Sequence, residues 1–117
     1  MTEEARPPVV DADDEQLRRL IHEHLKVFAK FTSDNCPACA ALAPPFAKFV
    51  DAPENADIFF VRLDSDQNPV AQQLMKERIA PFFVSYHQGR LLECDALTEE
   101  GEVVAQLARL RAFEPVR

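Results

Sequence analysis

The chain has 117 residues, a formal net charge of −7, and apolar residues at 47% of its positions. This length predicts a single domain over residues 1–117. The apolar content indicates a packed core and excludes a disordered chain. The acidic balance argues against a nucleic-acid partner, because the phosphates would repel it.

Membrane and export signals are not found in the sequence. No stretch approaches the roughly 20 consecutive apolar residues that a membrane span requires. The first residues, Met1-Thr2-Glu3-Glu4, lack the basic and apolar regions of a secretory signal. We therefore expect a cytoplasmic monomer without a membrane partner. Three cysteines are an odd number and do not suggest a framework of structural disulfides.

The first half of the chain alternates extended and helical patterns, separated by acidic and proline-bearing segments. Residues 1–10 predict a loosely ordered N-terminal segment. This segment ends in an expected edge strand at Val9-Val10. The elements expected after it are a helix over Asp14 to His24 capped by Asp11 or Asp13, a buried strand over Leu25 to Thr32, and a helix from Cys36 that bends at Pro44-Pro45.

The second half predicts two further helices and three strands. In chain order these are a strand over Ile58 to Leu63, a short helix from Asn68-Pro69 to about Arg78, a strand over Phe82 to His87, a turn at Gly89, a strand over Leu91 to Leu97, and a last helix capped by Thr98. This last helix is expected to cover the sheet with Val103, Val104, Leu107 and Leu110. The fold class is therefore α/β, a mixed sheet of four or five strands with helices on both faces.

The segment between the first confident strand and the next helix carries the motif Cys36-Pro37-Ala38-Cys39. A Cys-x-x-Cys pair in this context predicts a redox dithiol. The N-terminus of a helix stabilises negative charge, so the pKa of a cysteine thiol there is lowered. A structural pair and a metal site are the alternatives, but zinc requires four ligands and no second pair is present. We expect no metal and no cofactor.

Further features, in the same order and at the same separations, resemble the thioredoxin family from about Leu25 to Leu110. They are Pro44, five residues after Cys39; the Asp66-Gln67-Asn68-Pro69 segment after a strand; Ile79-Ala80-Pro81-Phe82 at the start of a strand; and Gln88-Gly89-Arg90 at a hairpin turn. The resemblance implies the thioredoxin fold. It also implies disulfide-bearing protein partners and a thioredoxin reductase as electron donor.

The motif and the resemblance together assign roles to individual residues. Cys36, at the helix end, is predicted as the nucleophile, and Cys39, one turn further in, as the resolving thiol. By resemblance, Pro81 is a cis-proline that presents backbone groups to the bound substrate chain. The substrate-binding residues expected around these are Asn35, Pro37, Ala38 and Ala80.

The sequence departs from the family pattern at Lys30, where thioredoxins have a buried acid that relays a proton to the second thiol. Arg62 stands where the family has the lysine partner of that acid. An ammonium near the thiols would favour the thiolate and make the protein more oxidising. Alternatively, Lys30 extends its ammonium to solvent and leaves the sulfurs unaffected.

We expect a thiol–disulfide oxidoreductase that acts on protein partners and maintains cell redox homeostasis. The alternatives are a thioredoxin-fold binding or adaptor module without redox turnover, and a glutaredoxin-like protein that uses glutathione. Asn35 in place of the usual tryptophan and the loss of the buried acid favour the adaptor. Cys94 is a third redox thiol, a glutathionylation site, or a small buried apolar residue.

Overall fold

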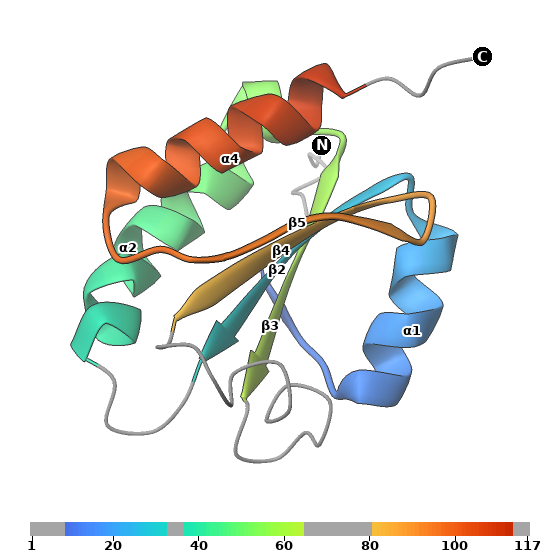
Figure 1. The fold of residues 1–117 in the computed structure, drawn as a ribbon, viewed down its shortest axis with the longest axis horizontal. Coiled ribbons are helices and arrows are strands. Elements are labelled where there is room, and N and C mark those ends of the chain that lie inside the picture. The colour runs from blue at the N-terminus through green and yellow to red at the C-terminus, as the bar shows by residue number, and fades with distance from the viewer. Residues whose placement is uncertain (1–8, 33–36, 65–80, 114–117) are drawn as a thin grey trace, which may run out of the picture.

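The computed structural model describes residues 9–32, 37–64 and 81–113, and its elements alternate as expected for an α/β protein. They are β1 (Val10–Asp11), α1 (Asp14–Glu23), β2 (Lys26–Thr32), α2 (Pro37–Asp51), a 3-10 turn (Pro53–Asn55), β3 (Ile58–Asp64), β4 (Phe82–His87), β5 (Arg90–Ala96) and α4 (Glu100–Ala112). Figure 1 shows α1 on one face of the sheet and both α2 and α4 on the other. The predicted helix from Asn68-Pro69 to Arg78 lies outside the described residues.

The five strands form one mixed sheet in the order β1-β3-β2-β4-β5. Strand β2 lies at its centre, parallel to β3 and antiparallel to β4. Strands β4 and β5 form the expected antiparallel hairpin, and β1 pairs in parallel with β3 at the edge. The predicted fold class, a mixed sheet with helices on both faces, is confirmed.

Alternation along the central strand divides the core into two layers. Val27, Ala29 and Phe31 are buried on the face that α1 covers, whereas Phe28 is buried on the face that α2 and α4 cover. Successive side chains of a strand point to opposite faces. Lys30, two residues after Phe28, therefore belongs to the α2/α4 face.

Helix α1 has a capping box at its N-terminus. The Asp13 carboxylate accepts a hydrogen bond from the Gln16 backbone N–H at 2.8 Å, and the Gln16 side chain accepts one from the Asp13 N–H at 2.9 Å. This pair satisfies two N–H groups that have no partner within the helix. Of the two candidate caps, Asp13 is the cap, whereas Asp11 binds Arg62.

Helix α4 differs from the prediction at its start and on its outer face. It begins at Glu100 with Glu99 as the N-cap residue, so the prediction of Thr98 as cap was wrong. Val103 is buried, but Val104 is 44% exposed, because the next residue along a helix is rotated by about 100°. Gln106 is buried instead and donates a hydrogen bond to the Ser85 hydroxyl at 3.3 Å.

Within the described ranges, no helix combines the length and apolar character needed to cross a membrane.

Candidate dithiol site

Cys39 lies in the first turn of α2, which begins at Pro37. Its side chain is only 7% exposed and is disulfide-bonded, whereas Pro37 is exposed. Pro37 suits this position because the first helical residue needs no N–H donor. Cys36, Asn35 and Ala80 lie outside the described residues, as does the side chain of Ala38.

Pro81 is buried directly before β4. Phe82, the next residue, pairs with Phe31 on β2. Pro81 therefore lies at the end of the sheet where β2 finishes at Thr32, and α2 begins after the intervening segment 33–36. The topology brings the predicted substrate platform and the Cys39 helix to the same end of the sheet.

The Lys30 side chain lies beneath the start of α2. It is 1% exposed, and its Nζ donates a hydrogen bond to the Cys39 carbonyl oxygen at 3.1 Å. The same Nζ lies 5.3 Å from the centre of the Phe46 ring, within the range of a cation–π interaction. The alternative in which Lys30 extends to solvent is therefore wrong.

Burial is the main cause of the low pKa of Lys30. Desolvation, with a smaller contribution from the charge of Arg62, lowers this pKa from 10.5 to about 8. Arg62 pairs with Lys30 in the β2–β3 register, but its guanidinium binds both carboxylate oxygens of Asp11, at 2.7 and 3.0 Å. The hydrogen bond and the charge of Asp11 raise the pKa of Arg62 despite its partial burial. Arg62 thus stays charged and repels the Lys30 ammonium.

Comparison with known proteins agrees with this fold. The thioredoxin family model matches residues 8–109, which is most of the chain.

This protein belongs to the thioredoxin family.

Thioredoxin H3 from Arabidopsis thaliana is 28% identical over 96 residues, which cover 81% of this chain and 79% of that protein. Two solved structures show the same fold. Thioredoxin f from spinach chloroplast has a TM-score of 0.81 at 17% identity, with 95% of this chain and 100% of that chain covered. Mitochondrial thioredoxin 3 from Saccharomyces cerevisiae, in its oxidised form, has a TM-score of 0.78 at 21% identity, with 87% and 95% covered. Membership in this family supports a thiol oxidoreductase in general.

Relative to Cys39 on α2, Cys94 lies on the other face of the sheet. It is not disulfide-bonded and is of intermediate burial, it lies opposite Val84 on β4, and it packs against the core cluster under α1. Burial, with smaller contributions from Cys94 and Asp14, raises the pKa of Tyr86 on this face to about 12. These contacts favour the interpretation of Cys94 as a small, partly buried apolar residue.

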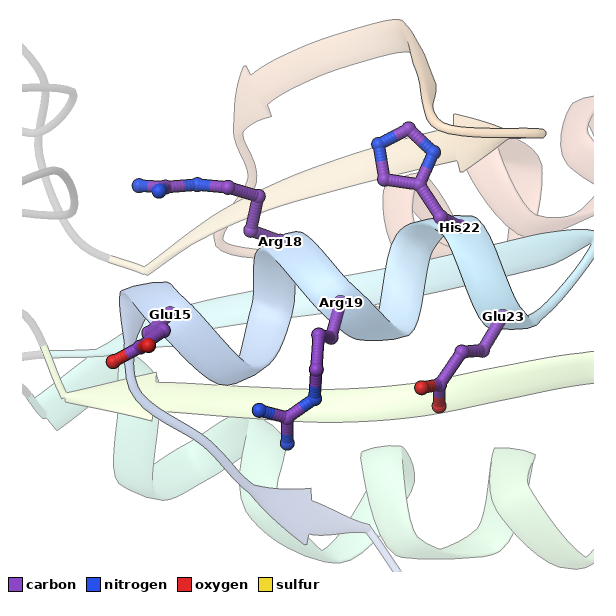
Figure 2. A pocket seen from close by; sticks show the side chains of 5 residues that line it. All are labelled: Glu15, Arg18, Arg19, His22 and Glu23. Carbon is purple, nitrogen blue, oxygen red and sulfur yellow. The ribbon is translucent and has the colours of Figure 1, made fainter.

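The outer surface of α1 carries a shallow charged hollow, also on the face opposite α2. Figure 2 shows that all the labelled side chains in it come from this one helix; they are Glu15, Arg18, Arg19, His22 and Glu23. His22 packs against the β4–β5 turn, where a Cβ at Gly89 would lie 2.5 Å from the His22 ring. The hollow contains none of the predicted site residues of this thioredoxin-family member.

The sequence interpretation missed Phe46 as a neighbour of Lys30. A signal for it was present, because Cys39, Leu42, Phe46 and Val50 follow helical spacing, and all four are buried. This spacing places Phe46 on the inner face of α2, two turns after Cys39. It could not by itself identify the lysine beneath the ring.

Proposed function

We propose that this protein exchanges disulfides with protein partners through Cys36 and Cys39, and so contributes to cell redox homeostasis. The observation that carries the proposal is the disulfide-bonded, nearly buried Cys39 in the first turn of a helix at the end of the sheet. A resolving thiol has to be held close to the nucleophile and shielded from competing reagents. The burial of Cys39 in the first turn of α2 supports this role.

In the reducing direction, the Cys36 thiolate attacks one sulfur of a partner disulfide, and the partner's other sulfur leaves as a thiolate. Cys39 then attacks the Cys36 sulfur of the mixed disulfide and releases the partner sulfur that was bonded to Cys36. Two electrons pass from the Cys36–Cys39 dithiol to the partner disulfide. The N-terminus of α2 supports these thiolates through its free N–H groups and its dipole.

Substrate contacts are assigned around these cysteines. Pro81 provides the platform for the extended chain of the partner, and its position beside the end of β2 supports this role. The exposed side of Pro37 is available for contact. Asn35, Ala38 and Ala80 complete the proposed substrate-binding set.

In the reducing direction, protein disulfides are the proposed substrates and a thioredoxin reductase is the proposed electron donor. One structural neighbour comes from work on thiol resolution in a yeast mitochondrial 1-Cys peroxiredoxin via glutathione/thioredoxin systems. That neighbour has a TM-score of 0.77 at 20% identity. It supports a protein partner for this chain by analogy of fold.

The test is an equilibrium redox titration in graded glutathione buffers, with alkylation of free thiols and mass measurement. We expect a reversible two-electron transition assigned to Cys36 and Cys39, and reduction of a model protein disulfide that Cys36→Ser abolishes. Cys94→Ser is the matched control and should retain both properties. A parent protein that forms the disulfide but does not turn over would indicate an adaptor module instead.

A further inference from the structure

Thiol–disulfide exchange does not by itself require a buried ammonium, yet Lys30 places one beside Cys39. An ionised amine removed from water is costly unless a partner compensates it. Lys30 is 1% exposed, and in the described part of the chain no carboxylate lies within ion-pair distance of it. Its partners there are the Cys39 carbonyl oxygen and the Phe46 ring.

Among the residues that the structure describes, the charged groups that face Lys30 do not compensate its charge. From β3, Arg62 repels it. From β1, Asp11 is occupied by Arg62. From β4, the residue in register is Phe83, which is apolar and buried. From α2, the group to consider is the sulfur of Cys39, whose own carbonyl oxygen accepts the hydrogen bond from Lys30. This sulfur carries no charge while it is disulfide-bonded.

We propose that Lys30 is the counter-charge of the reduced site, so that this protein favours the oxidation of partner dithiols. The inference rests on the proposed exchange through Cys36 and Cys39 and assigns its direction. Lys30 reaches the site through the backbone of Cys39, and it is therefore a positioning residue for the thiolate.

The oxidising step starts from the Cys36–Cys39 disulfide. A partner thiolate attacks the Cys36 sulfur, a partner–Cys36 bond forms, and the Cys36–Cys39 bond breaks. The electron pair stays on the Cys39 sulfur, which leaves as a thiolate in the residue whose carbonyl oxygen accepts the hydrogen bond from Lys30. A second partner thiolate then attacks the partner sulfur of the mixed disulfide and releases the Cys36 thiolate.

After this step the partner dithiol has become a disulfide, and the protein disulfide has become a dithiol. The two partner protons pass to solvent or to the cysteines. A low-molecular-weight disulfide such as oxidised glutathione returns the pair to its starting form. The charge of Lys30 favours the reduced product, because an opposite charge nearby stabilises a thiolate and lowers the pKa of its thiol.

The experiment measures the equilibrium between the full-length protein and glutathione at pH 7 for the parent, Lys30→Met and Lys26→Met. We expect Lys30→Met to lower the equilibrium constant for reduction about tenfold, equivalent to a potential about 30 mV more negative. Lys26→Met is the matched control. Lys26 lies on the same strand and the same face as Lys30, and its Nζ also donates a hydrogen bond to a backbone carbonyl, that of Arg111. Lys26→Met should leave the equilibrium constant for reduction unchanged.

Lys30→Gln separates the charge from the hydrogen bond, since it keeps a donor but removes the charge. It also provides a second variant if Lys30→Met does not fold. We expect Lys30→Gln to shift the constant as Lys30→Met does, and a parent-like constant in Lys30→Gln would overturn the role of the charge. The difference between parent and variants should shrink above about pH 8, where Lys30 loses its proton.

The possible failures are distinguishable. A parent that titrates reversibly, with the same constant in all variants, would overturn this inference and leave the proposed function intact. A parent in which no disulfide forms between Cys36 and Cys39 would overturn the proposed function, and the inference with it.

Discussion

The two ends of β2 carry the same residue type on the same face, in opposite electrostatic settings. Lys26 is half-buried and donates a hydrogen bond at 2.8 Å to the carbonyl of Arg111, in the last turn of α4. Lys30 is fully buried and donates at 3.1 Å to the carbonyl of Cys39, in the first turn of α2. Both ammonium groups bind a helix carbonyl, but they meet opposite ends of a helix.

The helix dipole distinguishes these two contacts. The last turn of a helix has carbonyls without partners and a partial negative charge, so a cation there is favourable. The first turn has the partial positive charge, and a cation there is unfavourable. Lys26 thus stabilises the fold through its contact with α4. Lys30 lowers the stability of the fold, and its proposed role is to stabilise the thiolate on α2. A buried charge that the fold does not need indicates a functional position.

The largest effect we expect is on the stability of the oxidised protein when Lys30 is replaced. Lys30→Met removes the cost of a buried ammonium and loses one hydrogen bond, so the free energy of unfolding should rise by about 2 kcal/mol at pH 7. Denaturant unfolding of both redox states measures it. In the reduced state the gain should be smaller by about 1.4 kcal/mol, because a tenfold shift in the redox constant equals that free energy. Equal gains in both states would remove the link between Lys30 and the dithiol.

The pH dependence of stability sharpens the comparison further. The pKa of Lys30 is about 8 in the folded protein and about 10.4 in an unfolded chain, so the unfolded state binds more protons between these values. Stability of the oxidised parent, relative to Lys30→Met, should therefore increase by about 2 kcal/mol from pH 8 to pH 10. Below pH 8 the difference should level off.

This increase in stability has to be measured as a difference from Lys30→Met, because the ionisation of Tyr86 lowers stability as the pH rises. Its pKa is raised to about 12, so its contribution to stability is lost as the pH rises above about 10. Tyr86 is present in both proteins and cancels in the difference. A flat difference between pH 8 and pH 10 would mean that Lys30 keeps an ordinary pKa.

The smallest effect belongs to the other end of β2. Lys26→Met should lower the free energy of unfolding by about 1 kcal/mol in both redox states, because the Arg111 carbonyl loses a charged donor at a helix C-terminus. The same unfolding series measures it. A change in redox equilibrium in this variant would contradict the assignment of Lys26 to stability alone. The two lysines are four residues apart, about 13 Å along a strand, which exceeds the Debye length of about 8 Å.

Short-range patterns in the sequence determined the elements and the context of the dithiol. The apolar runs predicted β2, β3 and β4 within one or two residues of their observed ends. Cys-x-x-Cys before a helical pattern predicted a helix from Cys36 that carries Cys39, and α2 begins at Pro37. These features depend on residues within one turn or one strand, so the order of the amino acids alone is sufficient to predict them.

Tertiary structure decided the environment of the individual polar side chains. Whether Lys30 reached solvent depended on α2 passing over it, and α2 is a separate element later in the chain. Asp13 and Asp11 were equivalent candidates as caps until the pairing of β1 with β3 placed Asp11 beside Arg62. Likewise, Gln106 is buried and Val104 exposed because the rotation of α4 on the sheet is set by the whole apolar face. Burial is a property of the elements that meet at a residue, and no local sequence pattern contains all of them.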